Sequence, residues 1–381
     1  MTRARILHLH SSFDLGGKEA RTAQLMNHFG SKAEHTVLVG DHDAMGARDA
    51  IDRTVDVSFP GDAAPSLLGK PNMWRYQKLA DYMANFDLIL SYNWGAMDGV
   101  MAHTLLGRFK KLPPLIHHED GFNEDEFETL NSKRNWFRRL ALARSYALVV
   151  PSKTLAQIAQ SAWNQPAAKI CHFPNGIKVD DYHKKPQRGS FPDFKKRDDE
   201  VVVGTVAGLR KVKNLPRLVR AVAAAGDNIR LAIAGEGPAR AEIEAEAARL
   251  GISDRVMMPG FVKNPARYIG LFDIFALSSD SEQFPISLVE AMAAKCPVVA
   301  TDVGDIRNMV TRNNLPYIVP RDDEAALARA IADLAELASL RKDIGYDNHL
   351  HAWENYQQSA MFDRYAKLYG SAIGRAEFAG Q

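Results

Sequence analysis

The stretch Arg5-Ile6-Leu7-His8-Leu9-His10 is a short apolar run that predicts a β-strand near the start of the chain. A turn over residues 11–17 follows it, and the apolar spacing over residues 18–28 predicts a helix. A strand, a turn that holds two glycines and a helix form the repeating unit of parallel α/β sheets. This opening therefore predicts an α/β fold.

The same alternation continues in two series. In the first series we expect strands at 36–39, 88–92, 115–119 and 147–151, and helices at 74–84, 99–108, 132–144 and 153–162. In the second we expect strands at 201–207, 229–234, 256–259, 274–276 and 298–300, and helices at 215–225, 239–250 and 285–294. Short strands rich in Val, Ile and Leu that alternate with helices predict parallel sheets covered on both faces. The pattern predicts two doubly wound domains.

The polar stretch 178–200, with Pro186 and Pro192, interrupts the pattern and predicts the connection between the domains. We expect an N-terminal domain at 1–177 and a C-terminal domain at 178–355, with a last helix, within about 356–381, that docks back on the first domain. A chain of 381 residues has room for two such cores. Ligands of open α/β sheets bind beyond the carboxyl ends of the strands, so we expect the site at the junction of the two sheets.

The composition excludes several classes of protein. With 48 basic and 46 acidic residues and 46% hydrophobic residues, the chain is neither disordered nor polybasic. Its two cysteines, Cys171 and Cys296, lie in no CxxC or Cys/His cluster, which argues against a disulfide framework and a zinc site. The sequence starts directly with a strand-like segment, so we expect no signal peptide, and it contains no apolar run of about 18 to 20 residues. We expect a cytoplasmic protein, with room for peripheral contact at the inner face of the cytoplasmic membrane.

The segment over residues 278–294 carries the most chemical information. It holds Glu282 and Glu290, separated by seven residues, with Pro285 placed to begin a helix between them. Amides in the first helical turn lack intrahelical acceptors and would point at an anion such as a phosphate. These amides belong to Ile286, Ser287 and Leu288. Two carboxylates around an anion site can accept hydrogen bonds from hydroxyls, which suits a sugar on one side and a ribose on the other.

Five other stretches of the chain carry motifs: Gly16-Gly17-Lys18-Glu19, Phe173-Pro174-Asn175-Gly176-Ile177, residues 206–214, Ala234-Gly235-Glu236-Gly237-Pro238 and Pro259-Gly260-Phe261-Val262. Together with residues 278–294, and in the same order along the chain, they resemble the family 4 glycosyltransferases (glycosyl transferases group 1). The resemblance implies a GT-B fold, with two Rossmann-like domains facing across a cleft, the donor mainly in the second and the acceptor mainly in the first.

The resemblance also implies an activity. It implies a retaining, metal-independent glycosyltransferase of the hexosyltransferase type that uses a nucleotide-sugar donor, a UDP- or GDP-sugar. The acceptor would be a hydroxyl of a glycan or a lipid-linked glycan in cell-envelope polysaccharide or glycolipid synthesis. No cofactor and no nucleic acid partner are implied.

Site residues follow from the same resemblance. Glu282 would contact the hydroxyls of the donor sugar, and Glu290 the ribose. The remaining expected donor-binding residues are Gly16, Gly17, Gly235, Gly237, Phe261, Phe284, Ile286, Ser287 and Leu288.

Basic residues suit the negative charge that develops on a leaving diphosphate. Lys213 fits the family's lysine position, but Gly208 stands where the family has an arginine. Arg210, two residues later, is the candidate replacement. We therefore expect Lys213 and Arg210 to be catalytic.

The strand at 115–119 ends in polar residues, where the family commonly has a His-Gly pair and this chain has Asp120-Gly121. On a regular strand His118 and Asp120 share one face. Either could accept a hydrogen bond from the acceptor hydroxyl or act as its base.

Residues 131–145 carry five cations and an aromatic pair, Trp136 and Phe137, without an acidic residue. On a helix they would form a broad basic face, which is typical of contact with anionic lipid. A solvated helix face explains the same composition, and the charge could also steer an anionic acceptor. Several acidic residues over 124–128 immediately precede it.

A metal site is not expected. Asp41-His42-Asp43 matches a DxD metal signature, but ordinary turn chemistry explains aspartates that directly follow a strand. No other segment clusters the oxygen ligands that magnesium or manganese requires.

Other functions stay open. A dehydrogenase is disfavoured because the nearest match to GxGxxG, at 235–240, has an arginine for the third glycine. A sugar-nucleotide epimerase would convert the donor without an acceptor. A non-catalytic sugar-nucleotide-binding scaffold subunit would explain the missing arginine and histidine.

Overall fold

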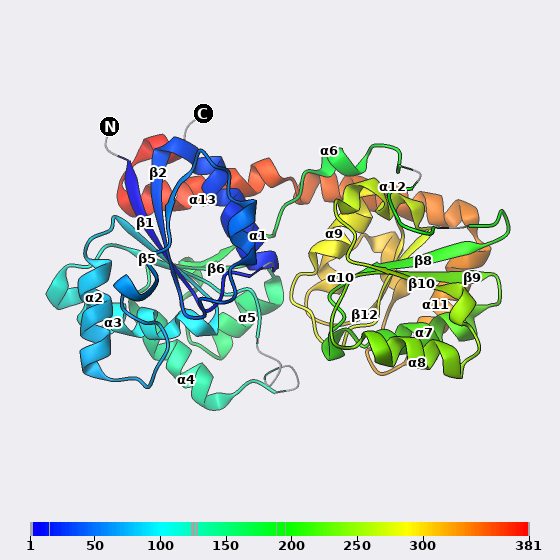
Figure 1. The fold of residues 1–381 in the computed structure, drawn as a ribbon, viewed down its shortest axis with the longest axis horizontal. Coiled ribbons are helices and arrows are strands. Elements are labelled where there is room, and N and C mark those ends of the chain that lie inside the picture. The colour runs from blue at the N-terminus through cyan, green and yellow to red at the C-terminus, as the bar shows by residue number, and fades with distance from the viewer. Residues whose placement is uncertain are drawn as a thin grey trace. The chain divides into compact units, whose positions relative to one another are not determined.

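A computed structural model describes residues 3–14, 16–122, 126, 129–187, 189–194 and 196–379. These form two compact units. Unit 1 contains the chain up to Asn175 and again from Ala360, and unit 2 contains Gly176–Ser359. Figure 1 shows a sheet with helices on both faces in each unit.

Unit 1 is built on a seven-stranded parallel sheet of order β3-β2-β1-β4-β5-β6-β7. Its strands are β1 (Ala4–His10), β2 (Ala33–Val39), β3 (Asp56–Ser58), β4 (Leu88–Tyr92), β5 (Leu115–His118), β6 (Ala147–Val150) and β7 (Ile170–His172). Its main helices are α1 (Gly17–Phe29), α2 (Met73–Met83), α3 (Met97–Lys110), α4 (Ser132–Ala141), α5 (Lys153–Ser161) and α13 (Gln358–Ile373). The central strand β4 is buried along its whole length, which explains its apolar sequence.

The last helix, α13, belongs to the core of unit 1. Its residues Tyr365 and Tyr369 are buried in one cluster with Leu90 of β4 and Ile116 of β5. The opposite face of the sheet is covered by a second cluster to which α2, α3 and α5 contribute.

Unit 2 is built on a six-stranded parallel sheet of order β10-β9-β8-β11-β12-β13. Its strands are β8 (Val201–Val206), β9 (Ile229–Ala234), β10 (Val256–Gly260), β11 (Ile274–Leu277), β12 (Val298–Thr301) and β13 (Ile318–Val319). Its helices are α6 (Val179–Tyr182), α7 (Leu215–Ala225), α8 (Arg240–Arg249), α9 (Ile286–Ala293), α10 (Ile306–Met309), α11 (Glu324–Glu336) and α12 (Ala338–Asn355). The expected fold class, two doubly wound parallel sheets, is confirmed.

Both sheets reverse their strand order beside their first strand. In unit 1 the reversal lies between β1 and β4, and in unit 2 it lies between β8 and β11. Connections leave the sheet in opposite directions at such a point, which opens a crevice at the carboxyl ends of the two strands. The loops that follow β1, β4, β8 and β11 are therefore the first places to look for a ligand site.

Candidate functional site

Lys213 and Glu282 meet at the strand reversal of unit 2. Lys213 ends a 3-10 turn after β8, and Glu282 lies in the loop between β11 and α9. The Lys213 Nζ lies 2.5 Å from Glu282 Oε1, although the two residues are 69 positions apart. The Ser279 hydroxyl donates to the same carboxylate oxygen at 2.8 Å. Both charged side chains are largely buried. A cation and a carboxylate thus share the crevice that the topology predicts.

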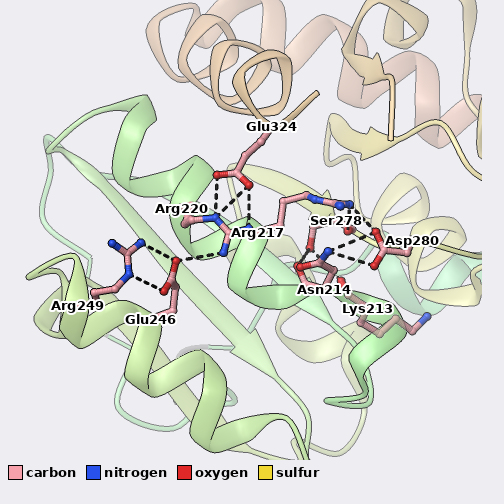
Figure 2. Close-up of polar contacts among 9 residues, drawn as sticks. All are labelled: Lys213, Asn214, Arg217, Arg220, Glu246, Arg249, Ser278, Asp280 and Glu324. Atoms are coloured by element: carbon pink, nitrogen blue, oxygen red, sulfur yellow. Dashed lines mark hydrogen bonds and ion pairs between the residues drawn. The ribbon is translucent and has the colours of Figure 1, made fainter. Parts of the chain in front are cut away.

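A second set of contacts fixes the two loops that carry this pair (Figure 2). Asp280, two residues before Glu282, accepts from Arg217 Nη1 at 2.8 Å and from Asn214 Nδ2 at 3.1 Å. The Ser278 hydroxyl donates to the backbone carbonyl of Asn214 at 2.9 Å. These bonds tie the loop after β11 to the start of α7. Arg217 and Asp280 were not among the sequence-predicted residues, because nothing local in the sequence indicates that they pair.

Arg210 lies close to position 208, where the family has an arginine. It is exposed, and its Nε lies 3.8 Å from the position that a Cβ at Gly208 would take. The Arg210 side chain therefore lies beside position 208, and its role as the replacement for the arginine stays a prediction.

Gly235 and Gly237 have a packing reason to be glycine. Both have φ near +150°, and a Cβ at Gly235 would lie 1.9 Å from the carbonyl oxygen of Ala207. A Cβ at Gly237 would lie 2.5 Å from the carbonyl oxygen of Leu209. The loop after β9 can approach the loop after β8 this closely only without side chains. This reason holds whether or not the glycines also line a nucleotide pocket.

Glu290 lies in α9, and its carboxylate is hydrogen-bonded to the short helix α6, which comes earlier in unit 2. Tyr182 Oη donates to Glu290 Oε1 at 2.6 Å. Burial raises the pKa of the Glu290 carboxyl to about 7, although the hydrogen bond from Tyr182 acts in the opposite direction. Glu290 can therefore change its protonation state near neutral pH.

The helix α9 begins at Ile286, with Pro285 as its N-terminal cap residue. The Leu288 amide already donates to the Pro285 carbonyl at 3.2 Å. Of the three amides expected to face an anion, those of Ile286 and Ser287 stay without an intrahelical acceptor. The anion site predicted from the sequence therefore keeps only the amides of Ile286 and Ser287 as donors.

The two expected donor-site aromatic residues differ in burial. Phe284 is buried and packs edge-on against Tyr356, with ring centroids 5.6 Å apart. Phe261, directly after β10, exposes 68% of its surface. Phe284 supports the loop from the core, whereas Phe261 is free to stack on a ligand.

In unit 1, Asp120 is held by an arginine that the sequence did not indicate. Arg21 of α1 makes two bonds to its carboxylate, of 2.5 and 2.7 Å, and a third to Asn175 Oδ1 at 2.8 Å. Burial alone would raise the pKa of Asp120, but the charge and hydrogen bonds of Arg21 outweigh burial and lower that pKa. Asp120 can accept a hydrogen bond, but the ion pair makes it a weak base.

The structure buries the side chain of His118, the last residue of β5, against Tyr369 of α13. Its Nδ1 lies 3.2 Å from the Ser91 carbonyl and its Nε2 lies 3.0 Å from Tyr369 Oη. Because a carbonyl only accepts, Nδ1 carries the proton and Nε2 accepts from the tyrosine. Burial and the charge of Arg21 lower the pKa of His118 to about 3. β5 ends at His118, so the strand pattern does not extend to Asp120, and Tyr369 of α13 covers the His118 ring.

Gly16 and Gly17 lie at the start of α1, as the sequence predicted. Gly16 precedes the helix and Gly17 is its first residue. A Cβ at Gly16 would lie 2.7 Å from Glu19 Oε2, and Glu19 is buried and paired with Lys18. The glycine therefore leaves room for the Glu19 carboxylate at the helix N-terminus.

The expected basic face of residues 131–145 needs correction. Arg138 of α4 is completely buried, with its Nη1 3.0 Å from Glu126 and its Nε 3.3 Å from Glu119. Its guanidinium also lies 5.1 Å from the ring centroids of Trp94 and Trp163. Helical periodicity turns one cation of the segment inward, so the basic face is narrower than the composition suggested. The other acidic residues expected nearby, Glu124, Asp125 and Glu128, lie outside the described residues.

Asp41-His42-Asp43 forms a turn. The Asp43 amide donates to Asp41 Oδ1 at 3.1 Å, which is the turn chemistry that explained the motif. Within the described ranges, no group of three or more His, Cys, Asp and Glu side chains is arranged to hold a metal ion.

Family models match both halves of the chain. Residues 15–181 match the model described as Glycosyltransferase Family 4, and residues 187–350 match that described as Glycosyl transferases group 1. The chain belongs to the family 4 glycosyltransferases. The members of this family have the GT-B fold, in agreement with the two Rossmann-like units.

Two curated relatives in this family cover part of the chain. N-acetyl-alpha-D-glucosaminyl L-malate synthase of Bacillus anthracis is 25% identical over 49% of this chain and 50% of its own length. N-acetylgalactosamine-N,N'-diacetylbacillosaminyl-diphospho-undecaprenol 4-alpha-N-acetylgalactosaminyltransferase of Campylobacter jejuni is 32% identical over 36% of this chain and 38% of its own length. The chain thus spans half or less of these two relatives.

Among solved structures, Alr3699/HepE of Anabaena in complex with UDP superimposes with a TM-score of 0.77. It is 18% identical, and the match covers 96% of this chain and 100% of that protein. At this identity the likeness shows the shared fold.

Proposed function

We propose that this chain is a retaining glycosyltransferase that moves a sugar from a UDP- or GDP-sugar to a hydroxyl of a glycan or lipid-linked acceptor, without a metal cofactor. The observation that carries the proposal is the Lys213–Glu282 pair at the strand reversal of unit 2. The proposed setting is cell-envelope polysaccharide or glycolipid synthesis in the cytoplasm. Both cysteines are free thiols, which is consistent with a reducing compartment.

The pair suits a site that exchanges partners when the donor binds. Without a ligand, Lys213 and Glu282 neutralise each other at 2.5 Å. A bound diphosphate would take the ammonium group, and a sugar hydroxyl would donate to the freed carboxylate. Each charged group then has a new partner, which offsets the energetic cost of separating Lys213 from Glu282.

Transition-state stabilisation would come from the same residues. As the bond between the anomeric carbon and the phosphate oxygen breaks, negative charge grows on the leaving diphosphate. Lys213, Arg210 and the amides of Ile286 and Ser287 are the donors available to that charge. Glu290 would accept from the ribose hydroxyls, and the exposed Phe261 ring could stack on the base.

The names of similar proteins support the donor and acceptor classes. The Anabaena protein was crystallised with UDP, which places uridine first among the bases to test. The Campylobacter jejuni relative is named for a diphospho-undecaprenol substrate, a lipid-linked glycan. The Bacillus anthracis relative is named for L-malate, so a small acceptor belongs in the screen as well.

Nucleotide binding is tested first, by thermal shift with UDP, GDP and ADP on the wild type and on Glu290→Ala. A ligand at about 100 times its Kd adds roughly 2.7 kcal/mol to stability, which raises Tm by a few degrees. We expect one nucleotide to stabilise the wild type and to lose that effect in the variant. A nucleotide that stabilises both proteins equally would contradict the role given to Glu290.

Turnover is then measured with the matching sugar nucleotides. Acceptor-dependent release of the nucleoside diphosphate supports transfer, and the anomeric coupling constant of the product, measured by NMR, reports retention. Isomerised donor would indicate an epimerase, and binding without turnover a scaffold subunit. Lys213→Ala and Glu282→Gln should abolish most turnover, whereas Lys211→Ala, an exposed cation of the same turn, should retain it.

A further inference from the structure

Four large apolar side chains are exposed on two helices of unit 1 that touch each other. They are Leu105 and Phe109 of α3 and Trp136 and Leu140 of α4, which we call the α3–α4 patch. Phe109 exposes 82% of its surface and Trp136 exposes 63%. In each helix the two members are four residues apart, so they lie on the same side of the helix.

The two apolar pairs lie on helices that are in contact. Thr104, beside Leu105, donates through its hydroxyl to the Ala141 carbonyl, beside Leu140, at 2.5 Å. This bond links α3 to the C-terminal end of α4. The residues next to Leu105 and Leu140 are therefore in direct contact, so the two exposed pairs lie on helices that pack against each other.

Basic residues surround the patch on both helices and on the segments that follow them. The exposed cations are Arg108, Lys111, Lys133, Arg139 and Arg144. Among the residues that the structure describes, none of these five makes an ion pair, and residues 99–118 and 129–147 contain no aspartate or glutamate. Asp81 of the adjoining helix α2 is already paired with Lys110. The positive charge around the patch is therefore not cancelled by acids on the same two segments.

We propose that the α3–α4 patch docks this protein on the surface of an anionic lipid bilayer. Exposed aromatic and aliphatic side chains enter the interfacial layer, and the surrounding cations contact the lipid phosphates. A second copy of the chain is a poorer occupant, because docking the patch on itself brings two sets of cations together. This contact does not require a segment that crosses the bilayer. Among the described residues, no helix is long and apolar enough to cross one. The proposal does not rest on sugar transfer.

The test is flotation of the full chain with vesicles of phosphatidylcholine alone or mixed with phosphatidylglycerol. We expect binding to the mixed vesicles, weakened by salt, and little binding to the neutral ones. Lys133→Gln with Arg139→Gln should lower the partition coefficient by about 25- to 30-fold, because each cation near such a surface is worth about 5-fold. Phe109→Ser with Trp136→Ser should abolish stable binding.

The matched control is Trp353→Ser, which removes an exposed tryptophan from α12 of unit 2 and should bind as the wild type does. All variants are checked by Tm, and Phe109→Ser alone serves if the double variant unfolds, because that side chain is almost fully exposed. No binding of wild type to anionic vesicles would overturn the proposal. So would equal binding by all variants, or a dimer in solution that the Phe109 and Trp136 variants dissociate.

Discussion

Replacing Glu290 with glutamine should stabilise the free protein at alkaline pH while removing nucleotide binding. Burial raises the pKa of the Glu290 carboxyl from 4.5 to about 7, so the folded protein holds this proton more tightly than the unfolded chain does. Stability from this group is complete below about pH 4.5 and is lost as pH rises towards 7. Above pH 7 the folded state carries a buried carboxylate that costs free energy. A glutamine keeps the carbonyl oxygen that accepts from Tyr182 and carries no charge.

The size of the effect follows from the shift. A change from 4.5 to about 7 corresponds to roughly 3 kcal/mol at about 1.4 kcal/mol per pKa unit, which is an upper limit. Because Glu290 is largely but not completely buried, we expect about 2 kcal/mol at pH 8. In a unit the size of Gly176–Ser359 this raises Tm by about 4 to 8 °C. At pH 4.5 or just below, the two proteins should have nearly the same Tm.

The assay is a series of thermal melts of wild type and Glu290→Gln between pH 4.5 and 8, with and without the nucleotide that stabilises the wild type. The Tm difference between the proteins should grow with pH and level off above 7. The nucleotide should stabilise the wild type less as pH falls below 7, because the protonated carboxyl is a poorer acceptor for ribose hydroxyls. A Tm difference that is the same at all pH values would refute the assigned protonation of Glu290.

Three further changes test other parts of the structure. Lys213→Ala should lower kcat by about 10²- to 10³-fold with a small change in Tm, as measured by nucleotide release, and unchanged kcat would remove it from the site. Arg138→Met should destabilise unit 1 by about 3 to 5 kcal/mol, because buried Glu119 loses its arginine partner and buried Glu126 keeps only Arg134. The exposed Arg139→Met should change urea unfolding by less than about 0.5 kcal/mol. Gly235→Ala should lower the free energy of unfolding by more than about 3 kcal/mol in the same assay, because its Cβ would overlap a backbone oxygen. The control Gly251→Ala also has a positive φ but has open space around it, and it should cost about 1 to 2 kcal/mol. Equal costs for the two variants would contradict the packing argument.

The sheet could be predicted because apolar runs and helical spacing are local signals. The exceptions are instructive. Strand β3 is three residues long and largely exposed, which is too short for any alternation to be recognised. The sequence prediction gave no element between residues 301 and 355, although α11 carries buried Leu327, Ile331 and Leu334 at helical spacing. That helix was detectable, whereas the two-residue strand β13 was not.

Only those residues of the candidate site that lie in recognisable motifs could be predicted from the sequence. Glu282 and Lys213 could be chosen from their motifs, but their contact depends on a sheet in which β8 and β11 are neighbours. Arg21 could not be found, because its partner Asp120 is 99 positions away and a single arginine in a helix carries no signal. That the His118 side chain is covered could not be found for the same reason. The residue that covers it, Tyr369, is 251 positions away.

Each unit places a cation and a carboxylate near the carboxyl edge of its sheet, but the two pairs differ chemically. The planar guanidinium of Arg21 makes two bonds to Asp120 and a third to Asn175, so a ligand that took it away would have to replace three bonds of fixed geometry. Lys213 is a compact charge on a flexible stem with one carboxylate partner, and a phosphate can replace that partner. The first pair therefore shapes the edge of unit 1, and the second is free to exchange with substrate. This difference is why we assign the charge-stabilising role to Lys213 and a positioning role to Arg21.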